Sequence, residues 1–142
     1  MTASIFDRIG RLRHDANGVA AVEFALLAPM LLVILLGTLA YGGYFWIAHS
    51  IQQLANDAAR TSLAGLTTAE RRDIATATVA SGLTRFAELS PDRTQVAVEE
   101  AGDWLIVRVS YDAAGSPFLN LGFVPLPDST IRRRAAVVLG GL

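Results

Sequence analysis

A run of 33 residues without a formal charge, from Phe24 to Asn56, constrains this chain more than any other feature. As a helix, its most apolar part, Phe24–Ala48, would be roughly 37 Å long at about 1.5 Å per residue. The hydrocarbon core of a bilayer is about 30 Å thick. The sequence therefore predicts a transmembrane helix within residues 19–48, and an ordinary soluble globule is nearly excluded.

Two other interpretations of this run are a cleaved signal peptide and the core helix of a soluble domain. A signal peptide has an apolar core of only about 7–15 residues, followed by a small-residue cleavage site. The present run is longer, and no Ala-x-Ala sequence follows Trp46. A core helix of this length without a charge is unusual. The length of the run favours a membrane anchor that is not removed at its far end.

The charges that flank the run predict its orientation. Residues 1–18 form a mildly basic leader with three arginines and two aspartates. Because positive residues are retained on the cytoplasmic side, the N-terminus is expected in the cytoplasm and residues 49–142 on the outer side of the membrane. Tyr41, Tyr44 and Trp46 lie near the far end of the run, where aromatic rings favour the membrane interface.

Residues 49–142 are expected to form a small α+β domain. The first helix is predicted to continue into it, because apolar residues recur at helical spacing and form one stripe. A second helix is predicted over Ala69–Leu89, since Thr67 and Glu70 form a capping box and Pro91 stops it. The stripe of the first helix consists of Ile47, Ile51, Leu54 and Ala58.

The pattern then changes from helix to strand. Residues 95–99 and 104–111 are rich in β-branched and aromatic side chains, which predicts a hairpin. Residues 131–139 could form a third strand, after a proline-rich loop over 112–128. In the second strand one face is apolar and is expected to turn toward the helices. That face consists of Leu105, Val107, Val109 and Tyr111.

Composition excludes several functional classes. All 12 basic residues are arginine and the net charge is −1, so no strong field would attract nucleic acid. Without lysine there is no Schiff-base chemistry and no Walker-A phosphate loop. Without cysteine there is no thiol catalysis, disulfide or cysteine-zinc site. We therefore expect a protein that is not an enzyme and needs no metal or cofactor.

The remaining polar clusters do not change this expectation. The two histidines, His14 and His49, are expected on opposite sides of the membrane, so they cannot form one site. The acidic group at 99, 100 and 103 is expected to be solvated at the tip of the hairpin. The arginine run 132–134 could contact phosphate, but arginines also keep an edge strand soluble. The apolar loop segments 117–119 and 122–126 either cover the domain's own core or face a partner.

The most informative motif precedes the apolar run. Glu23 is an ionisable residue one position before it, where a charge is costly. It could simply complement the positive end of the helix dipole. Alternatively, cleavage after Gly18 would leave a new amine on Val19 and make Glu23 the fifth residue of the mature chain. In a helical assembly, the Glu23 carboxylate could then pair with the Val19 amine of a neighbour and fix the axial register.

At these residues the chain resembles the TadE-like proteins, minor pseudopilins of the tight-adherence (Flp) pilus system that are related to type IV pilins. Their motif is a glycine, four residues, then Glu-Phe, and Gly18, Glu23 and Phe24 match it. Major Flp pilins instead carry Glu-Tyr and are shorter. The resemblance is strong over 18–60 and looser after residue 90, where the segment 107–111 also looks like the family.

The resemblance implies a bacterial inner-membrane protein that is cleaved by a prepilin peptidase at Gly18–Val19. It implies assembly with other pilin and pseudopilin subunits on an inner-membrane platform, in an adhesive pilus, with the small domain in the periplasm. The mechanism would be helix packing in the lipid bilayer, to which small residues contribute. Two rivals remain: an unprocessed, signal-anchored domain that binds a periplasmic partner, and an enzyme with a membrane tether. The small residues are Gly37, Ala40, Gly42 and Gly43.

Overall fold

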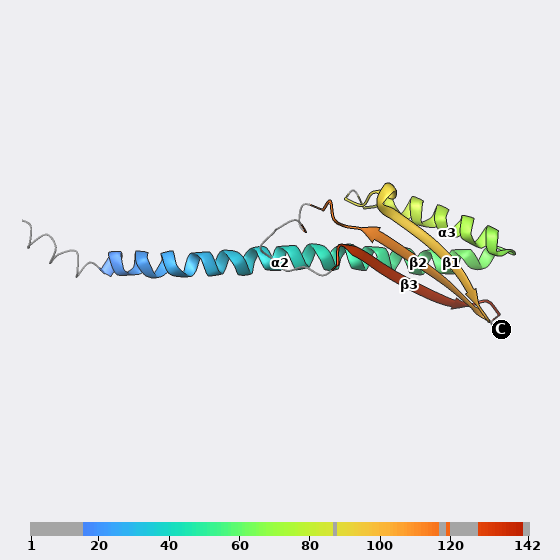
Figure 1. Cartoon of the computed structure of the whole chain (residues 1–142), viewed down its shortest axis with the longest axis horizontal. Helices are drawn as coiled ribbons and strands as arrows, with labels where there is room; N and C mark the ends of the chain where they lie inside the picture. Colours follow the sequence, from blue (N-terminus) through green and yellow to red (C-terminus); the bar gives the residue numbers. More distant parts are fainter. Residues whose placement is uncertain (1–15, 87, 117–118, 120–127, 141–142) are drawn as a thin grey trace, which may run out of the picture. The chain divides into compact units, whose positions relative to one another are not determined.

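The structure is a computed structural model that describes residues 16–86, 88–116, 119 and 128–140. It contains a long helix, a second helix and a three-stranded antiparallel sheet, so the predicted α+β class is confirmed (Figure 1). The chain divides into two compact units, residues 1–38 and 39–142. The long helix α2, Ala16–Thr61, contributes residues to both.

In the first unit, the described residues belong to α2 alone. The helix begins at Ala16, eight residues before the first residue of the apolar run. Thr38 returns a hydrogen bond to its own helix, its Oγ1 donating to the carbonyl oxygen of Ile34 at 2.8 Å. A polar side chain in an apolar helix is satisfied in this way without a partner outside the helix.

The second unit has its core where the later part of α2 meets the sheet and the helix α3, Thr68–Leu83. The predicted apolar stripe of α2 is confirmed, since all four of its members are at most 4% exposed. Alanines between them allow close packing, because Ala55, Ala58 and Ala59 are fully buried. α2 thus buries one side for its last four turns and keeps His49, Gln53 and Arg60 exposed.

The capping box at the start of α3 is confirmed. Thr67 Oγ1 accepts a hydrogen bond from the Glu70 backbone N–H at 3.2 Å, and Glu70 Oε2 accepts one from the Thr67 backbone N–H at 3.2 Å. These bonds satisfy two of the donors that the first turn of a helix leaves free.

The predicted end of this helix is wrong. α3 stops at Leu83, not at Leu89, and tight turns follow in which the Phe86 N–H donates to the Leu83 carbonyl oxygen. The reason lies in the packing, because these turns let Phe86 and Leu89 contact the core from an irregular segment.

The sheet consists of β1 (Thr94–Ala101), β2 (Trp104–Asp112) and β3 (Thr130–Val138), in the order β1-β2-β3. The predicted hairpin is confirmed, with Gly102 at a φ of +59° in its turn, a conformation that favours glycine. The third strand is confirmed as well and pairs antiparallel with β2. The predicted inward face of β2 is buried along its whole length.

An ion pair links α3 to β1. Arg71 Nη1 lies 2.7 Å from Glu100 Oε1, and Arg71 Nε donates to the Gly65 carbonyl oxygen at 3.0 Å. The hydrogen bond from Arg71 holds the pKa of the Glu100 carboxyl below its usual value. A carboxylate with a lowered pKa in the folded state stabilises the fold above its unfolded pKa, about 4.3, and loses that effect as the pH falls through its folded pKa.

Glu100→Gln is therefore expected to lower the thermal unfolding midpoint at pH 7 and to have a smaller effect at pH 3. At pH 7 the wild type keeps a charged partner for Arg71, which the variant lacks. Thermal unfolding of both proteins across this pH range measures the difference. If the midpoints of the wild type and Glu100→Gln differ by the same amount at pH 7 and at pH 3, the assigned role of the carboxylate is contradicted.

Candidate functional site: the exposed apolar helix

Residues 19–39 of α2 present large apolar side chains on all sides of the helix, and these are exposed. The most apolar window of 18 residues buries none of its residues in the chain. The core helix of a soluble domain would be mostly buried, so this interpretation of the run does not hold. A continuous apolar surface of this size requires an apolar environment. The exposed side chains include Val19, Val22, Phe24, Leu26, Leu27, Met30, Leu31, Leu32, Val33, Ile34, Leu35 and Leu39.

The interpretation as a cleaved signal peptide is also disfavoured. A signal peptide would be expected to end before the folded domain begins. α2 instead runs without a break to Thr61, and its residues 47–59 belong to the core of the second unit. The chain is thus a membrane-anchored protein with one described helix that is long and apolar enough to cross a bilayer.

The four residues of the predicted processing site lie on the exposed surface at the start of α2. Gly18, Val19 and Glu23 line one shallow hollow together with Val22. The side chain of Phe24 is 68% exposed. Within the described part of the chain, no hydrogen bond or ion pair reaches the Glu23 carboxylate. The site therefore offers an unpaired carboxylate one and a half helical turns from the peptide bond after Gly18.

The backbone conformation at this site was not predicted. Gly18 and Val19 both lie within α2, Ala16–Thr61, so the peptide bond between them is helical. A peptidase that cuts at this bond would have to unwind the helix locally.

The four small residues proposed for helix packing differ in their surroundings. An added Cβ at Gly37 or Gly42 would meet no heavy atom within 4 Å, so both positions face open space. Gly43 is half-buried, and Ala40 is fully buried within its own unit. Gly37 and Gly42 are therefore the positions at which another helix could approach the backbone.

The aromatic residues beyond this segment form a cluster. The rings of Tyr44 and Phe45 are 5.8 Å apart, nearly edge to face. Trp46 meets Phe86 of the turn after α3 in the same geometry, also at 5.8 Å. Trp46 remains 43% exposed, so one part of the ring packs on the domain and another stays accessible. The contact with Phe86 joins α2 to the chain after α3 and was not predicted.

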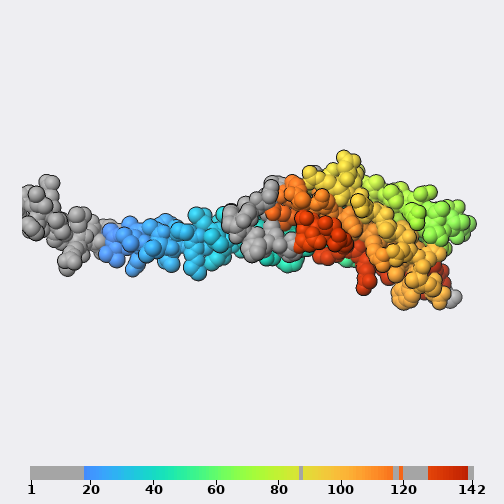
Figure 2. All heavy atoms as spheres, in the orientation of Figure 1, coloured from blue at the N-terminus to red at the C-terminus, as the bar shows by residue number. Residues whose placement is uncertain are grey.

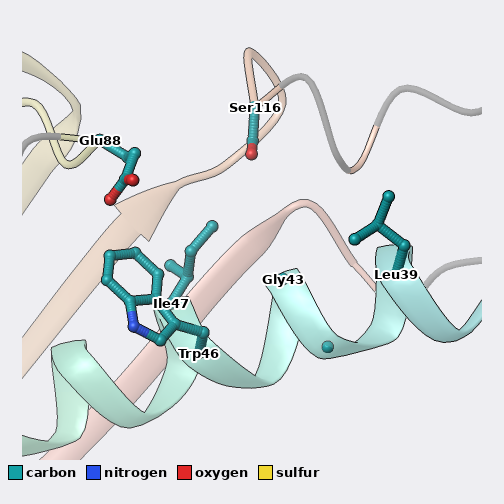
Figure 3. A pocket seen from close by; sticks show the side chains of 7 residues that line it. Leu39, Gly43, Trp46, Ile47, Glu88 and Ser116 are labelled. Atoms are coloured by element: carbon teal, nitrogen blue, oxygen red, sulfur yellow. The ribbon is translucent and has the colours of Figure 1, made fainter.

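A mainly apolar hollow of about 250 Å³ lies beside this cluster (Figure 3). Its polar groups come from Glu88 and Ser116, which lie across from the helix. Because the rest of the described lining is mainly apolar, the hollow can receive an apolar group. The helix side of the hollow is formed by Leu39, Gly42, Gly43, Trp46 and Ile47.

The titratable groups singled out by the sequence do not converge. His49 Nε2 lies 3.1 Å from Gln53 Nε2, while His14 falls outside the described residues. The acidic residues at 99, 100 and 103 are exposed as expected, and two of them also form ion pairs, Glu99 with Arg108 and Glu100 with Arg71. Among the described residues, no group of three possible metal ligands occurs.

The apolar loop segments 117–119 and 122–126 lie, except for Leu119, outside the described residues.

The comparison with protein families agrees with this picture. Residues 18–60 match the family described as TadE-like protein, a segment that includes the predicted processing motif, the exposed apolar segment and the part of α2 that lies in the core. No curated protein and no solved structure matches the chain. The match indicates a role associated with the Tad pilus and its components. The resemblance seen in the sequence is therefore confirmed over residues 18–60, the segment that matches the TadE-like family.

Proposed function

We propose that the protein is a minor pseudopilin that acts in the assembly of an adhesive tight-adherence pilus at the bacterial inner membrane. The observation that carries the proposal is the exposed apolar surface of α2, which coincides with the family match over 18–60. Lateral packing of this helix in the membrane would bring subunits together, and no catalytic step is required. The N-terminus lies in the cytoplasm and residues 49–142 in the periplasm, following the arginine bias of the leader.

The assembly step depends on Glu23. A carboxylate that has no partner among the described residues, next to an apolar segment, is costly once it is surrounded by lipid or by neighbouring helices. Cleavage after Gly18 creates a positive amine on Val19, four residues away. Pairing of Glu23 with the Val19 amine of a neighbouring subunit would remove the cost and define the axial position of the two helices.

Close approach of the helices depends on the small residues. Gly37 and Gly42 have free space around the position of a side chain. In lipid, helices associate where small residues allow their backbones to approach. Since they are five residues apart, about 140° around the axis of a helix with 3.6 residues per turn, they lie on nearly opposite sides of α2 and can contact two different partners.

The processing step is tested by measuring the mass of the protein extracted from membranes of its natural host. We expect the mass of residues 19–142. An intact leader would contradict the cleavage and would favour the alternative, an unprocessed membrane anchor with a periplasmic domain that binds a partner.

Glu23→Gln is expected to be cleaved normally but to reduce the number of pili by at least about tenfold, the effect of losing about 1.4 kcal/mol per contact. The substitution keeps the size of the side chain and removes its charge, so the pairing with the amine is lost. Electron microscopy of pili, with the mass of the variant, measures both steps. Asp73→Asn, an exposed change on α3, is the matched control. A normal number of pili in Glu23→Gln would refute the role of the carboxylate.

A further inference from the structure

We propose that the outer face of β2 and β3 carries a binding site for a phosphate group. The site consists of Arg108 and Ser110 on β2 and Arg132 and Arg134 on β3, and it lies entirely within the second unit. It is independent of the pilus assignment. Figure 2 shows β2 in orange and β3 in red, next to each other on the face that the view presents.

The strand register brings these side chains together. Arg108 is directly opposite Arg134, and Ser110 is directly opposite Arg132. All four residues lie on the face of the sheet that points away from the helices, since their neighbours along each strand alternate between exposed and buried. They line a hollow of about 300 Å³, to which the neighbouring Arg133 also contributes. The described lining of this hollow contains no carboxylate.

This arrangement opposes the stability of the sheet. Like charges directly opposite each other on paired strands are destabilising. Protection of a sheet edge explains arginines on β3, which is an edge strand. It does not explain why Arg108, on the central strand, lies directly opposite another arginine. A bound anion would account for both positions.

The chain neutralises these arginines only in part. Arg108 pairs with Glu99, and Arg132 Nη1 lies 3.5 Å from Asp128 Oδ2. The Arg108–Glu99 pair is about half exposed and the Arg132–Asp128 pair is more exposed, so each contributes little. In the described part of the chain, Arg134 has no ion pair, and its backbone carbonyl oxygen accepts a hydrogen bond from Gln52 at 3.1 Å. The hollow therefore keeps an excess of positive charge.

The donors fit a phosphate group better than a carboxylate. A guanidinium presents a rigid fork of N–H donors that binds two oxygens at once. Three such forks and one hydroxyl offer more donors than the two oxygens of a single carboxylate can accept. A phosphate group has additional oxygens and up to two negative charges. It could come from a lipid headgroup or from a free phosphate compound.

The test uses the full chain in a neutral detergent, titrated with inorganic phosphate at constant ionic strength set with chloride. We expect saturable binding by calorimetry and a higher thermal unfolding midpoint with phosphate. Arg134→Gln should weaken binding at least tenfold. Arg72→Gln removes an exposed arginine from α3, outside the hollow, and should bind like the wild type. Absence of saturable binding in the wild type, or equal binding by Arg134→Gln, would overturn the proposal.

A second readout separates a binding role from a structural one. Without phosphate, Arg134→Gln should unfold at the same temperature as the wild type or higher, because the substitution removes a repulsion. A lower midpoint without phosphate would show that the arginine stabilises the fold itself and would contradict the proposal.

Addition of phosphatidylglycerol to the micelles then identifies the source of the phosphate. Competition with inorganic phosphate supports the site and assigns it to a lipid headgroup. Unchanged phosphate binding supports the site and assigns it to a soluble phosphate compound.

Discussion

Gly18→Leu is expected to abolish removal of the leader while leaving membrane insertion unchanged. Under the proposed cleavage after Gly18, the processed fraction should fall to undetectable, because a leucine side chain at the residue before the cut would be too large for a peptidase pocket that accepts glycine. The fold should tolerate the change, since an added Cβ at Gly18 meets no heavy atom within 4 Å. Leucine also favours a helix more than glycine does, by roughly 0.8 kcal/mol, so the helix around residue 18 would unwind less easily.

The measurement is the mass of the membrane-extracted variant, together with its resistance to extraction by alkaline carbonate. Gly37→Leu is the matched control, because Gly37 also lies in α2 with open space around it. This control should be trimmed like the wild type. A Gly18→Leu protein that is trimmed normally would refute the assigned cleavage position.

Gly82→Val is expected to destabilise the second unit by about 3 kcal/mol, the upper end of the range for overfilled cores. Gly82 is buried near the end of α3, and an added Cβ there would lie 2.3 Å from Leu54 Cδ2. Leu54 is only 1% exposed, so its side chain has little room to move away. The two helices approach closely at this point because residue 82 has no side chain.

Equilibrium unfolding of the detergent-solubilised chain measures this effect. Gly42→Val is the matched control, since it places the same side chain in a helix where no heavy atom lies within 4 Å. The control should change the free energy of unfolding by less than about 1 kcal/mol. Equal destabilisation by the two variants would show that helix propensity, and not the contact with Leu54, explains the loss.

Both variants concern glycines in helices, but for different reasons. At Gly18 the missing side chain leaves free space on an exposed surface, where a second protein could bind. At Gly82 the space that a side chain would need is already filled by Leu54 of α2. In the sequence the two look alike, because each is a single glycine within a helical pattern. The distinction depends on what lies opposite, which only the folded chain defines.

The local features of this protein could be predicted from sequence because neighbouring residues encode them. Three features each depend on a short stretch of neighbouring residues. They are the apolar run of α2, the capping box of Thr67 and Glu70, and the alternation of buried and exposed residues along β2. Periodicity and capping chemistry act over one or two turns. The candidate site at Gly18 and Glu23 was found in the same way, from its position next to the apolar run.

The tertiary structure decided what depends on residues far apart in the chain. The end of α3 at Leu83 follows from the packing of Phe86 on Trp46, and the separation of the acidic residues at the hairpin follows from their different arginine partners. The apposition of Arg108 and Arg134 follows from the register of β2 and β3. A register and a helix contact are set by the combined burial of many side chains, so no single stretch of sequence contains them.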